Sequence, residues 1–238
     1  MNSSIYIFTL DTFMDIAWEW ANTLKVYTST ARSFTLNRNV TNQVLKRLGL
    51  TNEDLKMKKY GHMFVYWNRG TAKIKNIIIL ENHSTFFSYK RAAIEGLDIF
   101  TFTPDALIYG NGKMIIKSFS FLKEIADTNK VKVLYFGDID PEGFMIYRLL
   151  KEKYANIDIS LQLKAYTTLI ELCKFNYPCE GQSKDKKNIN YVLEELYKNN
   201  LHKEAKKIKE ICEKAYRIPQ ELITYEYFKN QGVIEWIE

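Results

Sequence analysis

The chain has 238 residues, of which 46% are hydrophobic, 14% aromatic and 26% charged. These proportions are typical of a globular protein with a sizeable core, and no run of roughly 18 apolar residues is present to span a membrane. The first residues contain acids and lack a basic region, which argues against a signal peptide, and 3 cysteines are too few for a disulfide framework or a zinc site. We therefore expect a cytoplasmic protein.

The charge balance is basic, with a formal net charge of +6 and an isoelectric point near 9.0. A basic protein of this kind often has a polyanionic partner such as nucleic acid. A lysine-rich, solvated surface explains the same balance equally well. Charge alone therefore leaves both interpretations open.

Residues 1–60 are predicted to be mostly helical. Apolar residues recur at helical spacing over 12–24, and a helix over 40–48 ends at Gly49, a good C-cap residue. The pattern then changes to short β-branched and aromatic runs. We expect strands over 62–67, 76–82, two short stretches of 97–113, 131–137 and 157–163.

Helices are predicted between these strands. Ser84 is expected to cap a helix over 84–96, and Ser118 a helix over 118–128. Another helix covers 141–154, and the chain beyond Tyr166 is expected to be helical nearly to its end. This alternation predicts an α/β fold, with βαβ units around a mostly parallel sheet.

Two of the predicted strands run directly into acidic residues. The strand NIIIL leads into Glu81, and VKVLYFG leads into Asp138 and Asp140. In open parallel sheets the ligand crevice lies beyond the carboxyl ends of the strands. Three carboxylates gathered there repel one another unless protons or a cation neutralise them. The pattern therefore predicts a site for a hard divalent ion, Mg²⁺ or Mn²⁺.

The acids also have structural interpretations. Asp140 precedes Pro141, and Asp at the N-cap with Pro at the first helical position is a common helix start. Glu81 taken alone is better explained as an ordinary loop acid. A helix needs only one cap, so Asp138 stays unexplained, and the three residues together favour function. A haloacid-dehalogenase-like phosphatase is a poor alternative, because its acid pair lies on the first strand.

Four short sequence motifs point to a particular protein family. They are ILENHSTFF (79–87), LIYGNGK (107–113), YFGDIDPEGF (135–144) and RIPQEL (217–222). Together they resemble the C-terminal domain of the JetD family, the nuclease subunit of Wadjet anti-plasmid systems. The Toprim domain of that family is related to the A subunit of topoisomerase VI. The resemblance spans about residues 60–230.

The resemblance implies a metal-dependent DNA endonuclease with a Toprim-like fold. Its metal-binding acids match Glu81, Asp138 and Asp140, and Glu221 is a candidate fourth acid. Asp138 and Asp140 would hold Mg²⁺ or Mn²⁺, while Glu81 would be a further ligand or a general acid or base. The implied partners are double-stranded plasmid DNA and a condensin-like, SMC-type ATPase complex. A homodimer is also implied, because double-strand cleavage usually needs two sites.

Several residues are candidate DNA contacts. Gly143 is expected to let a helix N-terminus approach a phosphate oxygen, and Lys113 follows a Gly-Asn-Gly turn. Lys58, Lys59 and Lys184 lie in basic clusters that suit sequence-independent phosphate contacts. For each lysine, a solvated surface position is the alternative.

The resembling proteins have a longer N-terminal part, with an arm and a winged-helix-like DNA-binding unit. We interpret residues 1–60 as a helical remnant of that region, and 61–238 as the Toprim-like catalytic domain with a helical C-terminal extension. Two other functions stay open. One is a non-catalytic DNA-binding or docking module. The other is a topoisomerase VI-like transesterase, although none of the 16 tyrosines stands in a matching context.

Overall fold

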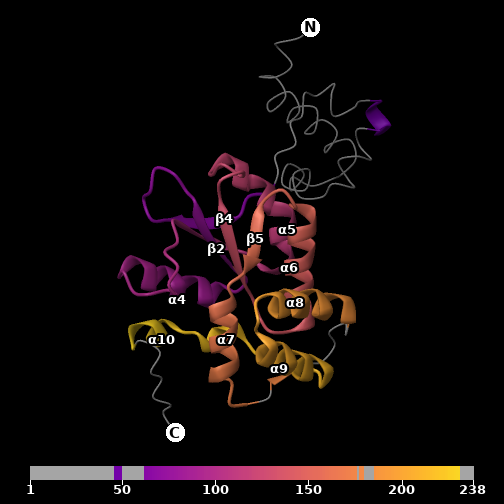
Figure 1. Ribbon diagram of the computed structural model, residues 1–238. Helices are drawn as coiled ribbons and strands as arrows, with labels where there is room; N and C mark the ends of the chain where they lie inside the picture. The colour runs from indigo at the N-terminus through magenta and orange to yellow at the C-terminus, as the bar shows by residue number, and fades with distance from the viewer. Residues whose placement is uncertain (1–45, 50–61, 176, 180–184, 231–238) are drawn as a thin grey trace, which may run out of the picture. The chain divides into compact units, whose positions relative to one another are not determined.

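The computed structural model describes residues 46–49, 62–175, 177–179 and 185–230 (Figure 1). The chain divides into two units, Met1–Tyr60 and Gly61–Glu238. In the first unit, residues 46–48 are helical and Gly49 follows with a φ of 65°, as expected of a C-cap glycine. The helix predicted over 12–24 lies outside the described residues.

A five-stranded, mostly parallel sheet forms the centre of the described part of the second unit, in the order β1-β3-β2-β4-β5. Only β1 is antiparallel to its neighbour. The strands are β1 (Val65–Asn68), β2 (Asn76–Leu80), β3 (Ala106–Tyr109), β4 (Lys132–Phe136) and β5 (Asp158–Leu161). Residues 77–80 of β2 are fully buried, which explains their unbroken apolar run. The predicted α/β fold is confirmed.

Two helical connections leave the middle of this sheet in opposite directions. α4 (His83–Ile94) follows β2 on the way to β3, and α6 (Pro141–Lys153) joins β4 to β5. Right-handed crossovers then place the two helices on opposite faces of the sheet, as Figure 1 shows. The direction of winding therefore reverses between β2 and β4, and ligands bind beyond the strand ends at such a switch point.

The remaining helices of the described residues cover the sheet and its lower end (Figure 1). They are η1 (Gly112–Met114), α5 (Ile115–Ser118), η2 (Phe119–Glu124), α7 (Leu163–Leu172), α8 (Lys186–Lys198), α9 (His202–Glu213), η3 (Gln220–Leu222) and α10 (Tyr225–Lys229). A two-stranded antiparallel sheet of β6 (Tyr177–Pro178) and β7 (Tyr216–Arg217) interrupts the predicted helical region. No helix of the described ranges is long and apolar enough to cross a membrane.

Three local predictions are wrong. No strand forms over 97–105, where the Asp98 side chain accepts a bond from the Thr101 amide and stabilises a turn instead. The helix predicted over 118–128 is a 3₁₀ helix ending at Glu124, because Phe119 and Leu122 are buried at a spacing of three residues. Finally, α4 begins at His83 rather than after Ser84.

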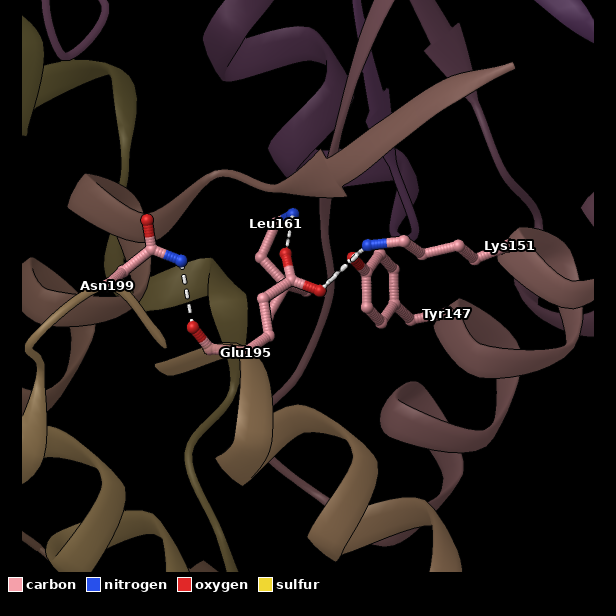
Figure 2. Close-up of polar contacts among 5 residues, drawn as sticks. All are labelled: Tyr147, Lys151, Leu161, Glu195 and Asn199. Carbon is pink, nitrogen blue, oxygen red and sulfur yellow. Dashed lines mark hydrogen bonds and ion pairs between the residues drawn. The ribbon is translucent and has the colours of Figure 1, made fainter. Parts of the chain in front are cut away.

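A half-buried polar network ties α8 to α6 and β5 (Figure 2). The Glu195 carboxylate accepts bonds from the Tyr147 hydroxyl at 2.5 Å, the Lys151 ammonium at 3.0 Å and the Leu161 amide at 3.0 Å. The side-chain amide of Asn199 donates to the Glu195 carbonyl at 2.8 Å. This network holds α6, the helix that Asp140 caps, against its neighbours.

Candidate functional site

The three predicted acids lie at one end of the sheet, at the switch point between β2 and β4. The Glu81 amide donates to the Phe136 carbonyl at 3.2 Å, so the strand pairing continues into the site. A Cβ placed on Gly143, in the first turn of α6, would lie 3.3 Å from Glu81 Oε2 and 3.4 Å from Asp140 Oδ1. It would also lie 2.7 Å from the Asp138 carbonyl oxygen, so all three residues surround this glycine.

The Glu81 carboxylate occupies a tight slot. The Tyr135 hydroxyl donates to Glu81 Oε2 at 2.8 Å, and a Cβ on Gly137 would overlap that same oxygen. Burial raises the pKa of Glu81 to about 8, with the Asp138 charge adding to the rise and the Tyr135 bond opposing it. A carboxyl group with this pKa can both give and take a proton near neutral pH.

Asp138 is held by residues that are distant in the sequence. Its Oδ1 accepts from the Gln220 backbone amide at 2.9 Å and from Asn82 Nδ2 at 3.4 Å. Arg217 lies 4.0 Å from its Oδ2, at the limit of an ion pair. Burial raises the pKa of Asp138 to about 6, opposed by the Gln220 bond and assisted by the charge of Glu221.

Asp140 has the capping role that its position before Pro141 suggests. Its Oδ1 accepts from the Gly143 amide at 2.7 Å, as an N-cap residue does. The approach of a phosphate oxygen to this helix N-terminus, which Gly143 is expected to allow, stays a prediction, and the Gly143 amide itself is bonded to Asp140. The absence of a side chain at Gly143 instead makes room for the Asp138 carbonyl and for Glu81.

The carboxylate oxygens of these acids are ligands that suit a divalent cation, although the side chains do not already surround a metal position. Buried carboxylates with raised pKa values, as at Glu81 and Asp138, carry charge that a hard cation would offset, and oxygen is the preferred ligand of Mg²⁺ and Mn²⁺. Within the described ranges, however, no group of three His, Cys, Asp or Glu side chains is arranged to hold a metal ion. Mg²⁺ usually keeps several water molecules and binds through one or two carboxylates, so a metal site here would not need three acids.

The other predicted residues divide into two groups. Lys113 forms a 2.7 Å ion pair with Glu142, in the first turn of α6, so it lies at the rim of the acidic site. Glu221 joins the site through a 2.6 Å bond from Asn82. The remaining candidates lie outside the described residues: Lys58, Lys59 and Lys184.

Four residues of this site were not among those predicted from the sequence. Asn82, Arg217 and Gln220 stand inside the strings ENHSTF and RIPQEL, so the strings themselves were the available signal. Tyr135 resembles a core residue because it lies in an apolar strand. Nothing in the sequence indicates that its hydroxyl meets Glu81.

The fold and these acids define an α/β domain with an acidic site at the switch point of a mostly parallel sheet. Comparison with protein families then gives a direct match. The family described as Wadjet protein JetD, C-terminal, matches residues 35–231, and the chain belongs to this family. A search of curated proteins found no match. The resemblance to JetD is therefore confirmed, and membership places the chain in the JetD group of the Wadjet defence systems.

Proposed function

We propose that this chain is a metal-dependent DNA endonuclease of a Wadjet-type plasmid-defence system. The observation that carries the proposal is the gathering of Glu81, Asp138 and Asp140 around Gly143 at the switch point of the sheet. The raised pKa values of Glu81 and Asp138 support it, because such perturbed acids concentrate at functional sites. Membership of the JetD family makes DNA the preferred phosphodiester substrate.

Each acid has a distinct role in this proposal. Asp138 and Asp140 would hold Mg²⁺ or Mn²⁺, with Glu221 as a candidate further ligand. When bound, the ion would activate a water molecule and offset charge that develops on the phosphate. Glu81, whose carboxyl group titrates at about pH 8, would exchange a proton with the attacking or leaving oxygen.

The proposed substrate is double-stranded plasmid DNA, contacted through its backbone. The rim of the site carries two cations with exposed side chains, Lys113 and Arg217. Both cations suit contacts to backbone phosphates, which carry no sequence information, so binding is expected to be independent of sequence. A cytoplasmic, condensin-like SMC-type ATPase would select the DNA, and a homodimer would supply the second active site.

The first test incubates the purified chain with supercoiled and linear plasmid in Mn²⁺, in Mg²⁺ and in EDTA. We expect nicking or linearisation that needs the metal and disappears in Asp138→Ala. Asp158→Ala is the matched control, because Asp158 is exposed at the opposite end of the sheet. Cleavage that survives in Asp138→Ala would remove this site from the reaction.

A non-catalytic DNA-binding or docking module is the second candidate. It is favoured by the lack, among the described residues, of three acids already arranged around a metal position. Titration with Mn²⁺ by calorimetry separates the two. Metal binding that Asp138→Ala abolishes supports the nuclease, whereas DNA binding with no metal binding supports the module. A covalent protein–DNA adduct after denaturation would instead indicate a transesterase.

A further inference from the structure

The segment 217–222 returns to the acidic site from about 80 positions further along the chain. Ile218 and Ile139 exchange two backbone hydrogen bonds, of 2.9 and 3.1 Å. Two residues beyond Ile218, the Gln220 amide donates to Asp138 Oδ1 at 2.9 Å. The segment is therefore fastened to the main chain beside Asp138 and to its carboxylate at the same time.

Asn82 joins the same carboxylate from another element. Its Nδ2 lies 2.6 Å from Glu221 Oε1 and 3.4 Å from Asp138 Oδ1. A primary amide has two N–H bonds, so one neutral group can donate to two carboxylates that otherwise repel each other. Glu221 and Asp138 are thereby held at a fixed separation.

The side chain of Asn82 makes these contacts in place of the capping bond that is usual at its position. Asn82 is the N-cap residue of α4, where an asparagine oxygen usually accepts from an amide of the first turn. It makes no such capping bond here. Its amide group is directed instead toward Asp138 and Glu221, which indicates that the contact with the acids decides its orientation.

The side chain of Gln220 lies in an unfavourable environment. Its side chain is fully buried, and neither the oxygen nor the nitrogen of its amide has a partner among the described residues. Buried polar groups without a hydrogen-bond partner are unfavourable. The backbone of this residue is nevertheless held where its N–H meets Asp138, and unfavourable local arrangements of this kind concentrate at functional sites.

We propose that Asn82 and segment 217–222 form a latch that orients the Asp138 carboxylate and brings Glu221 into the site. Asn82 is then a positioning residue, acting through Asp138 rather than on the substrate. The latch leaves Asp138 Oδ1 committed to two donors and presents Oδ2 on the side of Arg217. This inference rests on the proposed nuclease function.

The kinetic test compares Asn82→Ala with Glu221→Gln and Glu221→Ala in Mn²⁺-dependent cleavage. Asn82→Ala should keep its melting temperature, since no helix cap is lost, and keep the KM for DNA within about 2-fold while kcat falls at least ~10-fold. Glu221→Gln and Glu221→Ala should both lower kcat, because each removes the charge of a candidate metal ligand, but Glu221→Gln should be the less impaired, because its side-chain oxygen still accepts from Asn82. Asn129→Ala, at an exposed position before β4, is the control.

Two kinetic results would overturn the latch. One is an unchanged kcat in Asn82→Ala. The other is a Glu221→Gln variant as impaired as Glu221→Ala, since Glu221 would then act through its charge and not through Asn82.

A second measurement separates the latch from the nuclease proposal. Hydrogen exchange in EDTA should show a protected Gln220 amide in the parent, exchanging at least ~10-fold faster in Asn82→Ala and in Asp138→Ala. The amide of Ile78, in the core of β2, should be unchanged in both. Equal Gln220 exchange in all three proteins overturns the latch whatever the cleavage result. A protected amide in a protein that never cuts DNA refutes only the nuclease.

Discussion

The hydroxyl group of Tyr135, on β4, donates a hydrogen bond of 2.8 Å to the carboxylate of Glu81, at the end of β2. Tyr135 is fully buried, so its phenol reaches the acid from the interior of the domain. The same hydroxyl lies 3.4 Å from the Gly143 carbonyl. Three elements, β2, β4 and α6, therefore meet at one phenolic oxygen directly beneath the acidic site.

Replacing Tyr135 by Phe should reduce cleavage without unfolding the protein. The change removes the donor that orients Glu81, and we expect kcat to fall about 10-fold. The free energy of unfolding should change by only about 1 kcal/mol, the net worth of one hydrogen bond. Tyr154→Phe, which removes a 3.2 Å bond to the Ile116 carbonyl, is the matched control and should retain activity. Equal activities of the two variants would contradict the role of Tyr135.

Gly137→Ala should inactivate the site by steric overlap. The new methyl group would collide with Glu81 Oε2 and lie 2.9 Å from the Tyr135 hydroxyl. We expect a stability loss of about 1–3 kcal/mol, typical of overpacking, and a fall in kcat of roughly 100-fold as Glu81 is displaced. Urea unfolding and plasmid cleavage measure the two effects. A variant with parental activity would show that the position of Glu81 is unimportant.

Stability in EDTA should decrease as the pH rises. The pKa of Glu81 rises from 4.5 to about 8 on folding and that of Asp138 from 3.8 to about 6, so the folded protein binds protons that the unfolded chain has released. The free energy of unfolding is therefore greatest below the unfolded pKa values and falls until the pH passes about 8.

Glu81→Gln should remove most of this slope. We expect the variant to match the parent near pH ~4 and to exceed it by about 4 kcal/mol near pH ~8, as measured by urea unfolding. Mn²⁺ should stabilise the parent increasingly as the acids ionise. A parent whose stability rises between these pH values would refute the raised pKa of Glu81.

The network around Glu195 should matter for stability. Glu195→Ala would remove the acceptor that the Leu161 amide, the Tyr147 hydroxyl and the Lys151 ammonium share. We expect a loss of about 2–4 kcal/mol in chemical unfolding, because buried donors would lose their partner. Glu194→Ala is the control at an exposed neighbouring position, where a change within about 0.5 kcal/mol is expected. Similar losses in both variants would contradict the network's importance.

Lys113→Ala should weaken DNA binding but not folding. Its ion pair with Glu142 is exposed, and such pairs contribute at most about 1 kcal/mol to stability. If Lys113 contacts one phosphate, the slope of log K against log salt should decrease by about 1. Lys132→Ala, at the opposite end of the sheet, should leave the slope unchanged. Fluorescence anisotropy over a salt series measures both, and identical slopes would remove Lys113 from the interface.

The central strands and their acidic ends could be predicted because their signal is local. The apolar run of 77–80 is buried on both faces of the sheet, and β4 repeats that pattern before Asp138. The structural role of Asp140 was equally local, because a cap bonds only the first turn of its own helix. Parallel topology then placed the ends of both strands at one edge.

The wrong predictions arose where tertiary contacts outweigh local preference. Ser84 is an acceptable N-cap residue in isolation, yet the strand β2 ends early enough for α4 to begin at His83. Residues 97–105 contain apolar side chains suited to a strand, but Ile99 is buried from a turn instead. Packing against the rest of the core decides such cases, and propensity does not include it.

The sequence by itself determined the α/β class, the family and the identity of the three acids, because periodic burial and strand-end acids are encoded within a few neighbouring residues. Only the tertiary structure decided what surrounds those acids. The Tyr135 phenol, the Asn82 amide and the Gln220 backbone reach them from β4, from the start of α4 and from the far end of the chain. Contacts between segments up to 139 positions apart, as between Asn82 and Glu221, leave no periodic trace in the sequence, since packing alone brings them together.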